Sequence, residues 1–267
     1  MMKNCAKKFW IVVPFVASLI SACSVGSTSI VKTCVLPSDQ QGTLQGKWQV
    51  TPIPIAVDAN SNFNSAEMGI VQASASTWNG FFSQSLNIQP LNVGTGTVPT
   101  SPQTNPSSGV CNTANVIVQN TTGAYISNSY VVIYKDATWP YTSQPNVYAL
   151  TTHCHATTGT LTAADGLQYF NATIVELNYQ NWFISGKQVP DLQSIITHEL
   201  GHVLGLGHTC EFGGATHVPD CNSSTLNSGY VGAVMYPTFG FNSSGAAIVR
   251  DTLDSNDQGR ANCLYGT

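Results

Sequence analysis

Charged side chains are scarce in this sequence, and their scarcity argues against several classes of protein. Lys, Arg, Asp and Glu make up 8% of the 267 residues, with 9 basic against 13 acidic side chains. No basic cluster occurs after the first ten residues, which argues against a nucleic-acid-binding protein. No internal repeat is evident. The hydrophobic fraction of 42% can build a real core, and a polarity drawn mainly from Asn, Ser, Thr, Gln and Gly suits an exported protein.

The amino terminus has the pattern of a targeting segment. Three lysines precede the apolar run at residues 9–20, which is too short to span a bilayer. The run ends in Leu-Ile-Ser-Ala-Cys23, which resembles a bacterial lipobox. We expect a signal peptide at residues 1–22, lipidation of Cys23 and a tether at residues 23–46, which would hold an exported protein on the cell envelope, at the outer membrane or cell surface. The alternative is an ordinary signal peptide and a secreted protein.

The cysteine count agrees with export to an oxidising compartment. Of the eight cysteines, Cys5 would be lost with the signal peptide and Cys23 would carry lipid. The other six could form three disulfides, with fifteen possible pairings. A short loop favours the pair Cys210–Cys221, and elimination then suggests Cys111–Cys154 and Cys34–Cys263.

The sequence carries one dense cluster of histidines, in which His198, Glu199, His202, Gly205 and His208 form the pattern H-E-x-x-H-x-x-G-x-x-H. Residues four apart leave the same face of a helix, so the first two imidazoles would point together. Glycine can end a helix in the left-handed conformation, which would let the chain return the third imidazole. Three nitrogen ligands with a fourth position open to water are typical of a catalytic zinc ion. A core helix with incidental histidines is the alternative, but it does not explain why three of the six histidines fall within eleven residues.

The rest of the chain predicts a single α+β domain at residues 47–267. Asp191 is placed to cap the helix that carries the first two histidines, and Asn64 or Ser65 to cap an earlier helix. Residues 92–109 are read as a surface loop because they contain almost no apolar side chain. Strands are predicted at residues 48–57, 86–91, 116–119, 130–134, 147–152 and 169–178, and helices at residues 65–82 and 254–264.

A second motif lies 27 residues after the third histidine, where Val234, Met235, Tyr236 and Pro237 resemble the Met-turn of metzincin peptidases. Together with the histidine motif, it identifies the chain as similar to the matrixin-like metzincins, of a bacterial lipoprotein type. The resemblance covers about residues 47–267. It implies a twisted, mixed five-stranded sheet with two long helices, followed by a small C-terminal subdomain with the Met-turn and a final helix.

The resemblance also implies roles for individual residues. Glu199 would act as general base in a zinc endopeptidase whose peptide or protein substrate lies extended along an edge strand. Ile174 and Glu176 on that strand would line the substrate pocket. Tyr236 and Pro237 would form the wall of the pocket that takes the substrate residue after the cleaved bond. We expect a monomer with zinc as cofactor and calcium as a secondary expectation. The alternative is a surface lipoprotein that binds a ligand, in which zinc has only a structural role and no reaction is catalysed.

The sequence departs from the matrixin pattern in three respects, one of which is the extra cysteine pair around residues 210–221, which is not typical of vertebrate matrixins. No Pro-Arg-Cys-Gly segment precedes the domain, so latency through a cysteine switch is not expected, and a disulfide is the preferred role of Cys34. Vertebrate matrixins carry a second, structural zinc. The candidate ligands for such an ion in this sequence are His153, His155, Asp165 and His217. A pair of histidines at a strand end beside a disulfide is the simpler interpretation of the first two.

Overall fold

The computed structural model describes residues 29–98, 104–105, 110–111, 130–154, 163, 165–170 and 172–266. Side chains of residues 95–98, 104, 105, 110, 111 and 130 lie outside that description. The signal peptide, Cys23, His155 and the strand predicted at residues 116–119 are also outside the described residues. No helix in the described part of the chain is long and apolar enough to cross a membrane.

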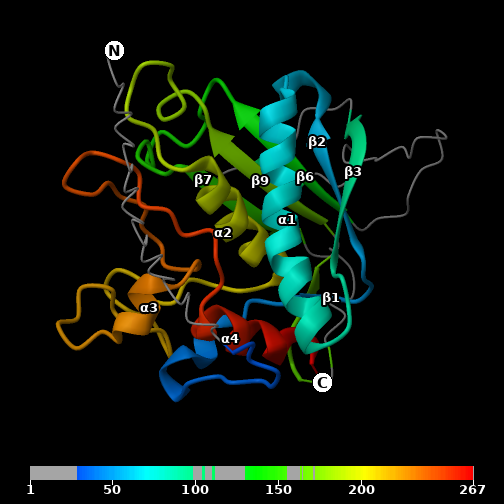
Figure 1. Cartoon of the computed structure of the whole chain (residues 1–267), viewed down its shortest axis with the longest axis vertical. Coiled ribbons are helices and arrows are strands. Elements are labelled where there is room, and N and C mark those ends of the chain that lie inside the picture. Colours follow the sequence, from blue (N-terminus) through cyan, green and yellow to red (C-terminus); the bar gives the residue numbers. More distant parts are fainter. Residues whose placement is uncertain are drawn as a thin grey trace, which may run out of the picture.

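A five-stranded mixed sheet forms the centre of the molecule, as expected (Figure 1). Its spatial order is β3 (Leu91–Val98), β2 (Ile53–Asp58), β6 (Tyr130–Asp136), β9 (Ala172–Asn178) and β7 (Ala149–Cys154). The pairs β2–β3, β2–β6 and β6–β9 are parallel, and β7 alone runs antiparallel, against β9. All seven residues of β9 are buried, which is typical of a strand that is covered on both faces.

Two long helices, α1 (Ser65–Ser85) and α2 (Leu192–Leu204), pack together against this sheet (Figure 1). Asn64 caps α1 through a capping box with Glu67, because each side chain accepts a bond from the other's backbone N–H. Fully buried Trp78 links the helices, since its indole N–H donates to the carbonyl of Thr197 at 2.8 Å. These contacts fix α2, and with it the histidine motif, above the sheet.

The smaller lower part of the molecule in Figure 1 combines the two ends of the described chain. It contains the 3-10 helix η1 (Ser38–Thr43) and the helices α3 (Ser228–Gly232) and α4 (Ser255–Tyr265). The remaining short elements are η2 (Ala59–Ser61), the pair β1 (Lys47–Trp48) with β8 (Tyr169–Phe170), and the pair β4 (Thr104–Asn105) with β5 (Val110–Cys111).

The cysteine pairings agree with the predictions where the structure describes them. Cys210–Cys221 and Cys34–Cys263 are both disulfides. Cys154 is also disulfide-bonded, but the side chain of its predicted partner Cys111 is outside the described part.

Four local predictions differ from the structure. The strand predicted at residues 86–91 is absent except for Leu91, because α1 runs to Ser85 and the chain turns over residues 86–90 before β3 begins. Residues 92–98, predicted as the start of a loop because they have few apolar side chains, belong to strand β3, since pairing with β2 satisfies their backbone. The strand at residues 172–178 was expected at the edge of the sheet, but it lies between β6 and β7. From Ser29 onward the predicted tether is docked on the domain, where Gln40 and Thr43 are buried.

Candidate metal centre

Helix α2 carries the first part of the centre. The side chain of Asp191 accepts a bond from Ser194 N at 2.7 Å and so caps the helix at its start. Gly205 ends it with φ 106° and ψ 11°, the left-handed conformation that the sequence predicted. A Cβ at this position would collide with the carbonyl oxygen of Gly46, so only glycine fits between the helix end and that segment.

Three imidazoles converge at the end of α2. Nε2 of His202 lies 3.1 Å from Nε2 of His198 and 3.2 Å from Nε2 of His208. Nδ1 of His198 lies 2.7 Å from the carbonyl oxygen of Val234, and Nδ1 of His202 lies 2.7 Å from that of Leu206. A carbonyl can only accept, so Nδ1 carries the proton in both rings and their Nε2 lone pairs face the shared point.

This arrangement fits a metal ion. Zinc bound tetrahedrally at 2.0–2.1 Å from each nitrogen would separate the nitrogens by about 3.3 Å, close to the spacing found. Burial lowers the pKa of His198 to about 3 and that of His208 to about 4, so both rings are neutral at pH 7 as ligands must be. Burial, followed by the charges of the other two histidines, lowers the pKa of His202 well below its ordinary value.

No second group of metal ligands occurs among the described residues. Asp165, a candidate for a structural zinc, pairs instead with Nζ of Lys47 at 2.6 Å. The ring of His153 stacks on Phe170 with centroids 3.9 Å apart. His217 belongs to no such group in the described part of the chain, and calcium, the secondary expectation, has no support here.

Glu199 lies one residue after the first histidine and points into the same cavity. Its side chain is buried, and Oε2 accepts a bond from Oγ1 of Thr151 on β7 at 2.5 Å. Burial raises the pKa of Glu199 to about 7, against the opposing effect of that hydrogen bond. Sequence reasoning did not identify Thr151, because its role depends on β7 lying beside α2.

The segment 233–237 passes directly beneath the histidines. Met235 is fully buried, and its Sδ lies so close to Gly201 that a Cβ there would collide with it. The carboxylate of Asp257 on α4 accepts bonds from Val234 N at 2.8 Å and Met235 N at 3.1 Å. Residue 234 in turn supplies the carbonyl for His198, so α4 fixes the backbone that orients the first imidazole.

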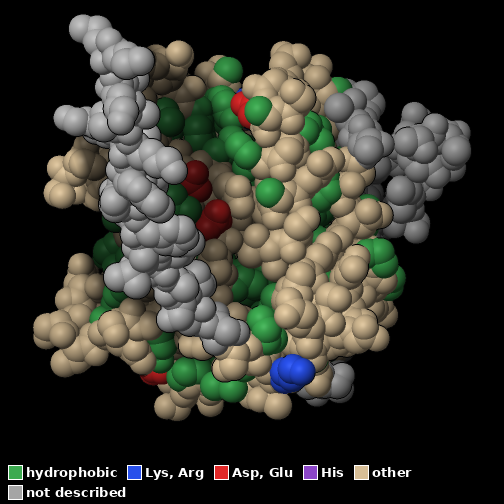
Figure 2. All heavy atoms as spheres, viewed as in Figure 1, with side chains coloured by type: hydrophobic (Ala, Val, Ile, Leu, Met, Phe, Trp, Pro, Cys, Tyr) green, Lys and Arg blue, Asp and Glu red, His purple; other side chains and the backbone are tan. Residues whose placement is uncertain are grey.

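A cavity of about 670 Å³ opens over the three histidines and Glu199. On the face of the molecule that Figure 2 shows, a few recessed acidic side chains lie among hydrophobic ones. Of the two residues predicted to wall the pocket, Pro237 is part of the cavity lining. Tyr236 is not, and its ring faces the Arg250 guanidinium at 5.3 Å. The lining also includes side chains that sequence reasoning missed, among them Tyr148, Leu150, Trp182, Glu211, Phe212 and Phe239.

Ile174 and Glu176, for which the sequence predicted pocket roles, do not line this cavity. Both residues lie on the internal strand β9 and are buried away from the cavity. Glu176 accepts a hydrogen bond from the hydroxyl of Tyr141. The strand that borders the cavity is β7, whose Ala149, Leu150 and Thr151 line it.

Comparison with known proteins agrees with this centre. A reprolysin family model, described as metallo-peptidase family M12, matches residues 53–246. The matched segment includes all three histidines and Glu199. No protein with a curated description matches the sequence. Because the match covers well over half of the chain and the three imidazoles converge as a metal site, the chain belongs to the M12 metallopeptidases, which are metzincin-type zinc peptidases.

Proposed function

We propose that the chain is a zinc-dependent endopeptidase that cleaves internal bonds of extended peptide or protein substrates. The observation that carries this proposal is the convergence of three imidazole Nε2 atoms beside the buried carboxylate of Glu199 in one cavity. His198, His202 and His208 would hold the ion. When bound, zinc supplies Lewis acidity, which polarises the scissile carbonyl and lowers the pKa of water.

Glu199 is the proposed general base. Its carboxylate would take a proton from the attacking water and return it to the amine that leaves when the peptide bond breaks. Thr151 holds one carboxylate oxygen by its hydroxyl, which leaves the other oxygen for that proton. Among the described residues, no Lys or Arg lines the cavity to neutralise Glu199, so its basicity is retained.

Strand β7 is the proposed binding edge for the substrate backbone. It pairs with β9 on one side, and no described strand pairs with its other side. An extended peptide could add there through main-chain hydrogen bonds and pass over the histidines. The aromatic side chains of Tyr148, Trp182 and Phe239 form an apolar wall next to that path, which favours a large hydrophobic residue beside the cleaved bond.

We infer that Met235 is the methionine of a metzincin Met-turn. The support is the position of this apolar side chain, which is fully buried against Gly201 under the histidine-bearing helix. Its carbonyl oxygen also accepts a bond from Thr209 N at 3.0 Å, directly after the third histidine.

Chelation tests the enzyme against the alternative of a binding module with structural zinc. We expect the purified chain to cleave a diverse peptide library at internal bonds, to stop when a chelator removes the metal, and to resume when zinc is restored. A zinc-loaded, folded chain that cleaves no peptide in the library would contradict the proposal and favour the binding module.

We also propose that a lipid on Cys23 anchors the enzyme to the bacterial cell envelope. The proposal is supported by the lipobox-like sequence that ends at this cysteine. Cys23→Ser should move the protein out of the membrane fraction into a soluble or unprocessed form. Unchanged fractionation, with a mature terminus at another residue, would instead indicate an ordinary secreted enzyme.

A further inference from the structure

The third histidine lies outside the helix that carries the other two. Helix α2 ends at Leu204. Gly205 N and Leu206 N still donate back to the carbonyl oxygens of His202 at 2.7 Å and Gly201 at 3.0 Å, but no such bond reaches residues 207–209. The segment 205–209 also pairs with residues 40–46, which we call the strap. Gly207 N donates to the carbonyl oxygen of Thr43 at 2.6 Å, and Gln45 N donates to that of Gly205 at 2.8 Å. Between these bonds, Leu44 and Leu206 form an antiparallel bridge.

The strap also holds the residue that follows His208. Nε2 of Gln40 donates to the carbonyl oxygen of Thr209 at 3.0 Å. Gln40 is fully buried, and its Oε1 accepts a bond from Asn256 of α4 at 2.5 Å. His208 is therefore flanked by two residues, Gly207 and Thr209, whose backbones both bind the strap.

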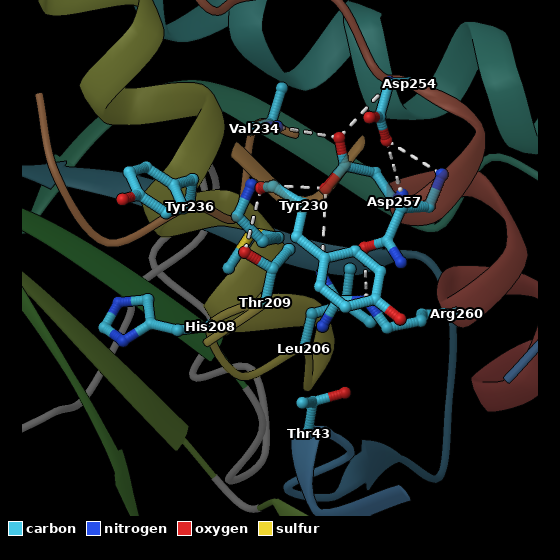
Figure 3. A network of polar contacts seen from close by, with 12 residues as sticks. Thr43, Leu206, His208, Thr209, Tyr230, Val234, Tyr236, Asp254, Asp257 and Arg260 are labelled. Atoms are coloured by element: carbon cyan, nitrogen blue, oxygen red, sulfur yellow. Dashed lines mark hydrogen bonds and ion pairs between the residues drawn. The ribbon is translucent and has the colours of Figure 1, made fainter. Parts of the chain in front are cut away.

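Packing leaves the turn little room to move away from the strap. A Cβ on Gly205 would collide with the carbonyl oxygen of Gly46. A Cβ on Gly207 would lie only 3.1 Å from the carbonyl oxygen of Thr43. From the other side, Nη1 of Arg260 donates to the carbonyl oxygen of Gly207 at 2.9 Å. In Figure 3, Thr43 and Arg260 both lie near Leu206, from which the chain leads on to His208.

The strap itself is fixed to helix α4. The disulfide Cys34–Cys263 joins the segment leading into the strap covalently to this helix, and Val35 N donates to the carbonyl oxygen of Gly259 at 3.1 Å. Helix α3 adds a further contact, because the hydroxyl of its Tyr230 donates to Oδ1 of Asp39, the residue before the strap, at 3.0 Å. Both the strap and α4 lie outside residues 53–246, the part of the chain that matches the M12 family. The support for the third ligand therefore comes in part from segments outside the matched range.

We propose that the strap positions His208 for metal binding and that Gln40 is its principal positioning residue. When the turn is held, Nε2 of His208 stays 3.2 Å from Nε2 of His202, the spacing that a tetrahedral ion requires. If the strap no longer holds the turn, zinc binding must itself order the imidazole of His208, and this cost weakens the affinity for zinc. Residues that support metal ligands typically change metal affinity by about 10- to 100-fold. The inference rests on the proposed zinc site.

The test compares Gln40→Met with Asn79→Leu in the full chain. Each substitution keeps an approximate side-chain volume and removes an amide that makes one donor and one acceptor bond. The Asn79 amide binds N and O of Leu91, far from the histidines, so this variant controls for general destabilisation. The readouts are the zinc Kd by chelator competition, the absorption spectrum of the cobalt-substituted protein and the Tm of the apoprotein.

We expect Gln40→Met to raise the zinc Kd about 10- to 100-fold and to alter the cobalt spectrum. Asn79→Leu should leave the zinc Kd and the cobalt spectrum unchanged, even if it lowers Tm as much as Gln40→Met does. Gln40→Leu removes the same two bonds with another apolar side chain and adds no charge. It should weaken zinc binding in the same direction, and it provides the test if Gln40→Met does not fold.

Two results would overturn the positioning role. One is a wild-type Kd and cobalt spectrum in the Gln40 variants, and the other is an equal loss of zinc affinity in Asn79→Leu. Failure of the unchanged protein to bind zinc is a separate result, because it would overturn the proposed zinc site itself.

Discussion

Gly205 ends the helix with a backbone conformation and a close contact that both exclude a side chain. Alanine in the left-handed conformation costs about 1–2 kcal/mol relative to glycine. At position 205 its Cβ would also collide with Gly46, whereas the space that a methyl group would occupy on Gly186, at φ 80°, is open.

We therefore expect Gly205→Ala to lower the free energy of unfolding by clearly more than Gly186→Ala, which should cost about 1 kcal/mol. Gly205→Ala should also reduce zinc content, because it displaces the turn that carries His208. Urea denaturation and metal analysis of both variants test this. Equal losses of stability would contradict the proposed close packing against the strap.

Thr151 and its neighbour Thr152 offer a matched test of the support for Glu199. Consecutive strand residues face opposite sides, and only Thr151 donates to the carboxylate. Thr151→Val should lower kcat about tenfold with zinc affinity unchanged, since a lost bond to a charged group is worth about 1.5 kcal/mol or more. Thr152→Val should leave kcat near the wild-type value, and an equal loss in both variants would contradict the assignment.

At the scale of elements, the capping box of α1 joins the sheet through an ion pair. Nζ of Lys135 on β6 lies 2.9 Å from Oε2 of Glu67, and the hydroxyl of Tyr179 donates to Oε1 at 2.8 Å. Burial raises the pKa of Glu67, but the bonds from Lys135, from the Asn64 backbone and from Tyr179 outweigh it, so the pKa lies below its ordinary value.

A carboxyl group with a lowered folded-state pKa stabilises the protein above its unfolded pKa, and this stabilisation is lost as pH falls through the folded pKa. Glu67→Gln keeps the capping geometry and removes the charge. We expect it to lower the urea midpoint at pH 7, and we expect the difference from wild type to shrink as the pH falls below 4.5, the ordinary pKa of glutamate. A constant difference between the two proteins across that range would contradict the linkage.

The sequence predicted those elements whose pattern is local. Helix α2, its Asp191 cap and its Gly205 end all follow from residue spacing and backbone preference. The order of the strands could not be read in this way, because β7 and β9 are both β-branched runs and only tertiary pairing decides which lies at the edge. Burial of the strap was also hidden, since Gln40 and Thr43 are polar and are buried through hydrogen bonds.

At the scale of the whole molecule, two disulfides of very different loop length constrain the chain. Cys34–Cys263 joins residues 229 apart, and Cys210–Cys221 joins residues 11 apart. In the chain-entropy description, the longer loop stabilises by about 5 kcal/mol and the shorter by about 3 kcal/mol. Replacing each pair by serines should therefore destabilise in that order in urea. A larger loss for the 210–221 pair would contradict this account.

The proposed enzyme is tested most directly by separating metal binding from turnover at Glu199. Glu199→Gln keeps the shape of the side chain and the three imidazoles, but an amide cannot accept the proton. We predict a single zinc ion per chain and a wild-type Tm, with peptide hydrolysis reduced about 10²- to 10⁴-fold. Hydrolysis at the wild-type rate by the zinc-loaded variant would contradict the account, because another group would then have to be the base.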